Sequence, residues 1–532
     1  MERIVKETKR KCSNSERSEK GSEGIMKGRV FLVGAGPGDV GLLTIKGKEI
    51  LEHAQVVVCD HLVGEEIMSL IPRDAELIDA GKRAGSHTMT QEEINQTLLE
   101  KAQEGKCVVR LKGGDPFLFG RGAEELELLL QQNIPFEVVP GVTSAFSVPA
   151  YNGIPVTHRD FASSVHILTG HRRQGEPSQF DFEALARLSG TLVFLMGVSA
   201  LEEICRGLLA AGMGPQTPAA VLQQGTCAGQ KKMIAGLADI TQEAKRQGVH
   251  PPAIFVVGEV CELGKRFGWY EKLPLFGHKV LVTRPSGRGE LLADRLRQLG
   301  AQVLEHPTIR IEKIKENRRL WREFQHLSQY NYLVFTSPAG VTVFFDELAA
   351  RGYDIRSLGM AKIVALGPGT AQEIFKRGLL CPHMPQVYDG EHLGILLGEI
   401  CEDGDKIFIP RAANGNLQLI REIQKRACVE VTDLPIYRTV CEEFPEYFDV
   451  KGQVEAGQIS MVVFTSASTV RGFAEAAKGL DYSLVRAVCI GRQTESAAQE
   501  FGMKTMKAKE ATIDGIVEAC IKLSNGGTDK WI

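Results

Sequence analysis

Three glycines at alternate positions form the first candidate binding loop. Gly34, Gly36 and Gly38 follow the apolar run at 30–33, and Asp39 comes directly after them. Glycines after an apolar run are typical of a strand that ends in a tight loop, where a ligand can contact the backbone. The dinucleotide fingerprint needs a glycine at position 39, because that glycine lets the following helix pack closely beneath a pyrophosphate. A carboxylate there disfavours a phosphate ligand.

Three later junctions between strand and loop share this composition. The sequence KGGDPFLFGRG at 112–122 follows the apolar run at 108–111, PGVTSA occupies 140–145, and TLVFLMG occupies 191–197. Such loops offer backbone amides, hydroxyl groups and a few acidic groups to a ligand. We therefore expect them to bind a cationic or zwitterionic nucleoside in preference to a polyphosphate.

Asp60 follows a second apolar run at 55–59 and supports an alternative. In a nicotinamide-dependent oxidoreductase, an acidic residue at this place holds the ribose hydroxyl groups. That alternative rests on a single glycine motif, which is a weak signal by itself, and Gly38 and Asp39 argue against it. It stays open as a competing hypothesis, which NAD(P)H binding would support.

The elements that must position these loops alternate along the chain. A helix is predicted at 44–54 with Ile45, Ile50 and Leu51 facing the core, and a capping box at 90–93 begins another helix. A strand is predicted at 108–111. Repeated βαβ units predict a mostly parallel sheet, whose ligand lies at the carboxyl ends of the strands.

Length and composition describe a multidomain globular protein. The chain has 532 residues, enough for about three or four domains, and 43% of them are apolar. A formal net charge of −3 gives no general basic field, so nucleic acid is not expected as a partner. The apolar runs are shorter than the ~18 residues of a membrane span, so a membrane partner is not expected either.

The cysteines and the N-terminal residues give weaker indications. The 12 cysteines are scattered without zinc-ligand spacing, which predicts a reducing, cytoplasmic location and no metal site. Residues 1–26 are charged and lack both periodicity and the apolar core of a signal peptide, so we expect a disordered tail. Met1 and Met26 are both candidates for the true start.

The second half follows a connector at 268–277, where Pro and Gly interrupt the periodicity. In this half KVLVTRPSG at 279–287 is similar to KIFIPRAANG at 406–415, and VFTSPAG at 334–340 is similar to VFTSAST at 463–469. A repeat at an offset of about 125 residues predicts two similar α/β units. A two-lobed binding or regulatory module without turnover is one interpretation of such loops.

From 28 to 267 the sequence resembles the uroporphyrinogen-III C-methyltransferases of the tetrapyrrole methylase superfamily. The resemblance is carried by GAGPGD at 34–39, DHLV at 60–63, GKRAG at 81–85, RLKGGDPFLFGRG at 110–122, PGVTSA at 140–145 and AVLQQG at 220–225. It implies two α/β lobes with S-adenosylmethionine bound between them. It assigns the methyl donor to Gly34, Gly36, Pro37, Gly38, Gly113, Gly114, Asp115, Leu118, Thr143, Ser144, Met196 and Gly225.

The same resemblance implies roles near the reacting ring. Asp60 would accept a proton and Lys82 would donate one, while Arg83 and Lys112 would bind substrate carboxylates. A pyrrole carbon that attacks a sulfonium methyl group needs in-line placement more than an activated nucleophile, and a carboxylate can take the proton that the macrocycle loses. The family usually has a tyrosine where this chain has Cys59.

From about 277 to 525 the sequence resembles uroporphyrinogen-III synthase. The resemblance is carried by TRP at 283–285, FTSPAGV at 335–341, ALGPGTA at 365–371, IYRT at 436–439 and FTSAST at 464–469. It implies two lobes joined by a two-stranded connector, with Tyr437 assisting the loss of a hydroxyl group. Substrate carboxylates would contact Arg284, Ser337, Ser466 and Thr494, and Glu495 replaces the alanine that often follows that threonine.

Together the resemblances imply an α/β protein with a two-lobed tetrapyrrole methylase fold, then a two-lobed synthase fold whose first lobe is discontinuous. The predicted boundaries are a methyltransferase at 27–267, with lobes at 27–140 and 141–267, and a synthase at 278–526, with one lobe at 278–306 and 441–526 and the other at 308–436.

The activity that the two resemblances imply is bifunctional. Hydroxymethylbilane would be cyclised to uroporphyrinogen III, with inversion of the last ring and loss of water. Two methyl groups from S-adenosylmethionine would then give precorrin-2 for siroheme or cobalamin synthesis. The expected partners are tetrapyrrole substrates and a second copy of the chain, because the methylase family is usually dimeric.

Overall fold

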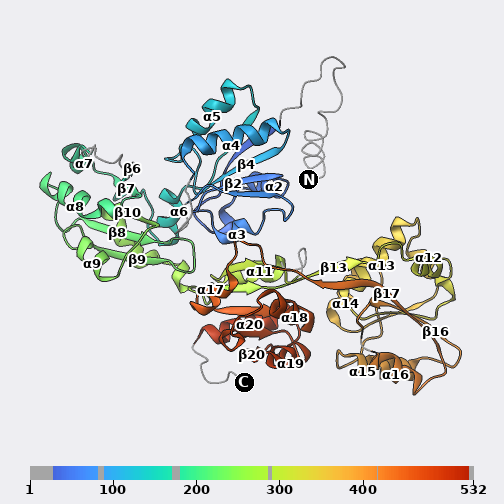
Figure 1. Ribbon diagram of the computed structural model, residues 1–532. Coiled ribbons are helices and arrows are strands. Elements are labelled where there is room, and N and C mark those ends of the chain that lie inside the picture. The colour runs from blue at the N-terminus through green and yellow to red at the C-terminus, as the bar shows by residue number, and fades with distance from the viewer. Residues whose placement is uncertain (1–27, 82–88, 171–179, 285–289, 416, 526–532) are drawn as a thin grey trace, which may run out of the picture.

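The computed structural model describes residues 28–81, 89–170, 180–284, 290–415 and 417–525. These residues form four five-stranded sheets, two in each half of the chain, and helices cover them (Figure 1). Both halves are therefore two-lobed α/β structures, and the predicted fold class is confirmed.

The first sheet is parallel throughout, with the strand order β3-β2-β4-β1-β5. Its strands are β1 (Arg29–Gly34), β2 (Val56–Cys59), β3 (Glu76–Asp79), β4 (Cys107–Lys112) and β5 (Phe136–Val139), and its helical segments are η2 (Val40–Leu42), α2 (Ile45–Leu51), α3 (Glu65–Met68), α4 (Gln91–Gln103) and α5 (Gly122–Gln131). Because the strands are parallel, the loops that follow β1, β2, β4 and β5 all leave the same edge of the sheet.

Two local predictions in this lobe have different outcomes. Thr90 and Glu93 form the expected capping box at the start of α4. The prediction that Ile45 faces the core is wrong, because its side chain is 80% exposed. The buried face of α2 is formed by Gly47, Ile50 and Leu51, whose helical spacing leaves Ile45 on the other side.

The second sheet is mixed, with the order β6-β7-β10-β8-β9. Its elements are α6 (Ser144–Tyr151), β6 (Val165–Thr169), α7 (Phe182–Arg187), β7 (Thr191–Leu195), η3 (Val198–Ala200), α8 (Leu201–Ala210), β8 (Pro218–Gln223), β9 (Lys231–Gly236), α9 (Ile240–Arg246) and β10 (Ala253–Val257). Only β6 and β7 pair in parallel, so the expectation of a mostly parallel sheet is wrong for this lobe. A short loop without a helix joins β8 to β9, and such a connection can make only an antiparallel pair.

The connector between the halves is packed against both of them. It contains η5 (Tyr270–Lys272), and η4 (Glu259–Leu263) and α10 (Gly264–Phe267) come directly before it. The Trp269 indole donates to the carbonyl of Ala150 over 3.0 Å, and the ring of Tyr270 lies 4.9 Å from that of Tyr151. At the other end Leu275 is fully buried in the core of the third sheet.

The third sheet is parallel, with the order β12-β11-β18-β19-β20. Its strands are β11 (Lys279–Val282), β12 (Gln302–Glu305), β18 (Met461–Phe464), β19 (Arg486–Cys489) and β20 (Lys504–Lys507). Its helical segments are α11 (Glu290–Gln298), α17 (Val450–Glu455), α18 (Ala467–Ala476), η8 (Tyr482–Leu484), α19 (Arg492–Glu500) and α20 (Ile513–Ser524). The chain therefore leaves this lobe after β12 and returns before α17.

The fourth sheet has the order β13-β17-β16-β14-β15. Its strands are formed by the part of the chain between β12 and α17. Its strands are β13 (Ile309–Lys313), β14 (Tyr332–Phe335), β15 (Lys362–Ala365), β16 (Lys406–Ala412) and β17 (Glu430–Cys441). Its helical segments are α12 (Arg318–Phe324), η6 (Leu327–Gln329), α13 (Pro338–Ala350), η7 (Ile355–Leu358), α14 (Pro368–Phe375), α15 (Gly390–Ile400) and α16 (Gln418–Gln424). The antiparallel pair β13 and β17 joins the two lobes (Figure 1).

The two halves of the chain contact each other through α3 and the third sheet. Glu66 accepts hydrogen bonds from Arg297 Nε (2.9 Å) and from the amide of Val303 in β12 (3.1 Å). Glu65, the preceding residue, pairs with Lys279 at 2.8 Å. The halves therefore form a polar interface in which side chains of α3 meet the start of the second half.

Candidate active sites

Three loops converge at the carboxyl edge of the first sheet. The amide of Gly36 donates to the carbonyl of Gly114 over 3.1 Å, and the amide of Gly114 donates back over 2.8 Å. A Cβ atom at Gly34 would lie 2.5 Å from the Cα of Gly141 and 2.7 Å from the Gly114 carbonyl oxygen. The loops after β1, β4 and β5 thus touch through their backbones, which only glycine permits.

Among these contacting glycines, Gly114 is the one with free space beside its Cα atom. Its φ is +68°, and a Cβ built there would meet no atom of the described chain within 4 Å. Gly113 beside it is close to the loop that follows β2, since an added Cβ would lie 3.0 Å from the Cβ of Leu62. The backbone at Gly114 can therefore approach a ligand without steric obstruction.

Asp115 ties the second and third loops together. Its Oδ1 accepts from the amides of Phe117 (2.9 Å) and Leu118 (3.2 Å), and its Oδ2 accepts from Gly141 (3.0 Å). Leu118 packs against the core of the second lobe. Thr143 caps α6, and Ser144 begins that helix. These residues shape the loops that face the second lobe.

Met196 and Gly225 lie in the second lobe. Met196 follows β7 with a left-handed backbone (φ 54°), and 47% of its side chain is exposed. An exposed, flexible apolar side chain on a strained backbone is typical of a ligand site more than of a core. A Cβ at Gly225 would lie 2.4 Å from Val148 in α6, so this glycine allows the loop after β8 to pack against that helix.

Asp39 is engaged within the protein. Its Oδ2 accepts from the Tyr151 hydroxyl at 2.7 Å, its Oδ1 accepts from the Gly41 amide at 2.7 Å, and its own amide donates to Thr226 over 3.3 Å. Burial and the Asp39 carboxylate raise the pKa of Tyr151 well above its usual range. Asp39 therefore fastens the first glycine loop, which contains Pro37 and Gly38, to the second lobe.

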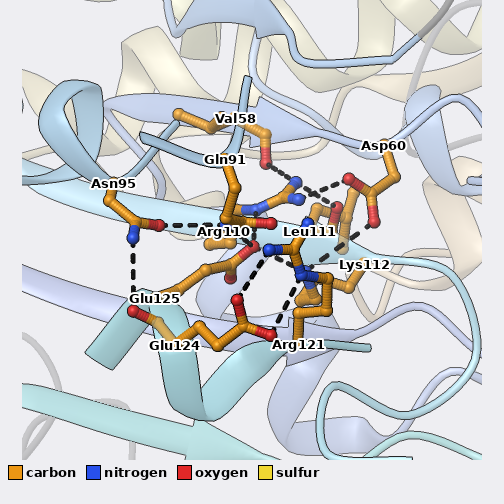
Figure 2. A network of polar contacts seen from close by, with 10 residues as sticks. All are labelled: Val58, Asp60, Gln91, Asn95, Arg110, Leu111, Lys112, Arg121, Glu124 and Glu125. Carbon is orange, nitrogen blue, oxygen red and sulfur yellow. Dashed lines mark hydrogen bonds and ion pairs between the residues drawn. The ribbon is translucent and has the colours of Figure 1, made fainter. Parts of the chain in front are cut away.

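Asp60 belongs to a network of buried charges (Figure 2). The guanidinium group of Arg110 donates to Asp60 through Nη2 and to Glu125 through Nε, the latter over 3.0 Å. Lys112 Nζ lies 2.6 Å from Glu125 Oε1 and 4.0 Å from Asp60 Oδ2. The Asp60 side chain is 31% exposed, whereas Arg110 is 2% exposed and Glu125 is fully buried. Of the two carboxylates that Arg110 binds, Asp60 is therefore the one that reaches solvent.

The basic residues predicted to act beside Asp60 are not all placed by the structure. Lys82 and Arg83 lie outside the described residues, so their roles stay predictions. Lys112 is 3% exposed and is bonded to Glu125, and burial with the neighbouring Arg110 lowers its pKa. This placement favours support of Asp60 over direct contact with a substrate carboxylate.

Two of the predicted residues of the second half, Ser337 and Ser466, cap helices. Ser337 caps α13, and its hydroxyl group lies 2.7 Å from that of Tyr437 in β17. Ser466 caps α18 in the same way in the other lobe, which agrees with the repeat found in the sequence. Thr494 is 4% exposed within α19, a placement that disfavours direct contact with substrate.

A cavity of about 900 Å³ lies where the two halves meet. Its walls include Arg73 from the first half and Arg284, His306 and Ala339 from the second. Burial and the nearby Arg73 lower the pKa of His306 to about 4, so this imidazole is neutral at physiological pH. The predicted substrate residue Arg284 thus lies beside the first half of the chain.

Sequence reasoning missed the role of Glu125. It lies on an amphipathic helix beside Leu126, and glutamate on a helix is normally solvated. The signal was its spacing: Glu125, Leu126 and Leu129 share the buried face of α5. A charged residue on that face requires a buried partner, and Arg110 and Lys112 in β4 provide two.

Two family models match the chain. The model described as tetrapyrrole (corrin/porphyrin) methylases matches residues 29–241, and the model described as uroporphyrinogen-III synthase HemD matches residues 290–518. The porphyrin biosynthesis protein HemD of Ruminiclostridium josui is 43% identical over 94% of this chain and 99% of its own length. The chain belongs to the family of fused uroporphyrinogen-III C-methyltransferases and uroporphyrinogen-III synthases.

Other relatives match the methyltransferase half. The S-adenosyl-L-methionine-dependent uroporphyrinogen III methyltransferase of Methanosarcina barkeri is 52% identical over 44% of this chain and 93% of its own length. A crystal structure of uroporphyrin-III C-methyl transferase from Thermus thermophilus, complexed with S-adenyl homocysteine, is 39% identical over 44% of this chain and 93% of that chain, with a TM-score of 0.38.

The fused methyltransferase–synthase is therefore a bifunctional enzyme of tetrapyrrole biosynthesis that uses S-adenosylmethionine as methyl donor. The alternatives of a nicotinamide-dependent oxidoreductase and of a second half without turnover are wrong. The open backbone at Gly114 and the exposed Met196 are accessible to a ligand. Within the described residues, no helix is both long and apolar enough to span a bilayer.

Proposed function

We propose that this chain converts hydroxymethylbilane into uroporphyrinogen III and then methylates that product twice to give precorrin-2, for siroheme or cobalamin synthesis. The observation that carries the proposal is the presence of both enzymes on one chain, since the product of the synthase is the substrate of the methyltransferase. The proposal also includes the predicted domain boundaries and a homodimer formed through the methyltransferase half.

In the methyltransferase half, S-adenosylmethionine supplies a methyl group on a positively charged sulfur. The residues proposed to hold it are the glycine loops, Leu118, Thr143, Ser144 and Met196. A pyrrole carbon of uroporphyrinogen III forms the new C–C bond while the C–S bond breaks, and the macrocycle then loses a proton. Asp60 takes this proton, because it is the partly exposed one of the two carboxylates that Arg110 binds, and it follows β2 at the edge of the sheet where the loops converge (Figure 2).

In the synthase half, hydroxymethylbilane loses its hydroxyl group as water, and the last ring closes after inversion. Tyr437 assists this loss, supported by its hydrogen-bond partner Ser337 at 2.7 Å. The open-chain intermediate is reactive by itself, so the protein mainly has to fold it and hold its carboxylates. Arg284 and Ser466 are proposed to contact substrate carboxylates. They come from the two separate segments of the chain that form the discontinuous lobe.

The methylation step is tested with authentic uroporphyrinogen III. The purified chain is incubated with this substrate and with S-adenosylmethionine, and the products are resolved by mass. We expect the mass of a doubly methylated macrocycle and two equivalents of S-adenosylhomocysteine. A product that carries one methyl group, or none, would contradict the assignment of precorrin-2.

A further inference from the structure

The charged network beside Asp60 contains a carboxylate with no assigned role. Glu125 Oε1 accepts from Arg110 Nε at 3.0 Å, from Lys112 Nζ at 2.6 Å and from Gln91 Nε2 at 3.3 Å (Figure 2). Its side chain is fully buried. Its second oxygen, Oε2, has no hydrogen-bond partner among the described residues.

Burying this carboxylate is costly for the fold. Burying an ionised group that lacks some of its hydrogen bonds costs several times more folding free energy than burying a neutral group whose hydrogen bonds are all made. Arg110 and Lys112 are two residues apart in β4, so their side chains leave the same face of the sheet and meet Glu125 of α5 there. An apolar residue at 125 would instead leave two buried cations with one partially exposed carboxylate.

The charges explain what Glu125 provides. Arg110, Lys112, Asp60 and Glu125 sum to zero, with the two cations lying between the two carboxylates. Arg121 and Glu124, at the start of α5, pair with each other at 2.6 Å and are exposed. Without Glu125, the positive potential of both cations would act on Asp60 alone, which would make its carboxylate a weaker base.

We propose that Glu125 is a positioning residue for methyl transfer, which holds Arg110 and Lys112 so that Asp60 keeps both its orientation and its basicity. This inference rests on the proposed role of Asp60 as proton acceptor. Glu125 does not touch the substrate, since it lies behind the two cations. Arg110 fixes Asp60 directly, and Lys112 completes the charge balance.

The test compares full-length variants with the wild-type chain in methyl transfer to uroporphyrinogen III. Glu125→Gln removes one charge without changing shape, and Glu125→Asp keeps the charge on a shorter side chain. Glu127→Gln, two residues along the same helix and exposed, is the matched control. Each variant is assayed for kcat and KM across acid and alkaline pH, and S-adenosylmethionine affinity is measured by calorimetry.

Glu125→Gln is expected to lower kcat by about tenfold or more, because a misplaced general base forfeits part of a typical 10²–10⁴-fold contribution. The acid limb of its pH profile should move to lower pH, with donor affinity unchanged, and Glu125→Asp should recover part of the loss. If Glu125→Gln behaves like Glu127→Gln in both kcat and pH profile, the inference is wrong.

Lys112→Gln provides a second test of opposite sign, which does not depend on how well Glu125→Gln folds. Removing this cation leaves the network negative, so the acid limb should move to higher pH while KM changes little. An unchanged acid limb of the pH profile would overturn the inference. A change in KM alone would also overturn it, and would indicate that Lys112 contacts the substrate.

Asp60→Asn separates this inference from the proposed function. If Asp60→Asn retains wild-type methyl transfer, the role of Asp60 itself fails. If Asp60→Asn is inactive while Glu125→Gln matches the wild type, the role of Asp60 stands and only the inference about Glu125 is refuted.

Discussion

Asp60 and Tyr437 each contact a side chain that orients them. Arg110 bonds Asp60, and Ser337 lies 2.7 Å from the Tyr437 hydroxyl group. Groups that are oriented in advance lose less freedom on binding and react in a fixed geometry. At the residue scale, proton transfer in both halves is therefore expected to depend on these two pairs.

The Asp60 pair predicts a selective loss of methyl transfer. Asp60→Asn keeps the shape of the side chain but cannot take a proton, so methyl transfer should fall by about 10²–10⁴-fold. Binding of S-adenosylmethionine, measured by calorimetry, should stay near the wild-type affinity. Asp74→Asn, which changes an exposed carboxylate of the same lobe, should leave the rate unchanged. Near-normal turnover of Asp60→Asn would remove Asp60 from the mechanism.

The Tyr437 pair predicts a slower ring closure. Tyr437→Phe removes the hydroxyl group near Ser337, and the rate of uroporphyrinogen III formation should fall by about tenfold or more, as expected for losing a proton donor. Tyr330→Phe is the control, since its hydroxyl group also bonds within this lobe, to Glu323 at 2.6 Å. Equal rates for the two variants would assign Tyr437 to packing.

At the scale of elements, the loops were easier to predict than the faces of strands and helices. Glycine spacing identified the loops after β1 and β4, because glycine is needed where backbones touch. The burial of Lys112 was not predictable in the same way: β4 is covered on both sides, so every residue from Val108 to Lys112 is buried whatever its polarity. Lys112 is buried because α5 packs over β4. The alternation of apolar and polar residues within one strand does not reveal such a neighbour.

The mixed second sheet shows the same limit. Alternating strands and helices predicted parallel pairing, and the first and third sheets confirm it. In the second lobe β10 inserts between β7 and β8, although it comes last in the chain. Strand order of this kind is decided by long-range packing, whereas local periodicity reports only that a strand exists.

The convergent glycine loops predict a specific effect at Gly114. Gly114→Ala forces a side chain into φ +68° and places a methyl group where the loops open, so S-adenosylmethionine affinity should fall by about tenfold or more. Gly212→Ala is the matched control: Gly212 also has a positive φ (+93°) and open space around it, but it follows α8. Both variants should lose similar stability, and calorimetry should show weaker donor binding only for Gly114→Ala. Equal affinities would mean that the donor does not approach this loop.

At the scale of the whole molecule, the two enzymes are joined by more than a linker. Tyr447 of the synthase half donates to the carbonyl of Met68 over 3.1 Å, and Arg73 of the methyltransferase half reaches Glu442 at 3.3 Å. The motifs predicted each fold separately, but the interface involves residues of no motif, such as Glu66 and Arg297. It could not be predicted from the sequence because both residues look like ordinary surface charges.

Glu66 makes this interface sensitive to pH. Burial raises the pKa of Glu66 from 4.5 to about 7, although Arg297 acts in the opposite direction. The folded chain thus holds this proton more tightly than the unfolded chain does, so the stabilisation is full below pH 4.5 and is lost as pH rises through 7. The loss is on the order of 3 kcal/mol at most, from about 1.4 kcal/mol for each pKa unit.

Glu66→Gln should remove that dependence, because the amide stays neutral at every pH. We expect the melting temperature of the wild type, measured by calorimetry, to fall relative to Glu66→Gln as pH rises toward and beyond neutrality. Glu65→Gln, the adjacent position in α3, controls for the loss of a carboxylate from the same interface, where Glu65 pairs with Lys279. Parallel curves for wild type and Glu66→Gln would show that Glu66 does not titrate in this range.

The most direct test of the central claim gives the purified chain enzymatically generated hydroxymethylbilane, with and without S-adenosylmethionine, and resolves the tetrapyrroles by mass and isomer. We expect type III uroporphyrinogen without the donor and a doubly methylated product with it. Type I isomer alone, with no methylated product even from authentic type III uroporphyrinogen, would contradict the central claim.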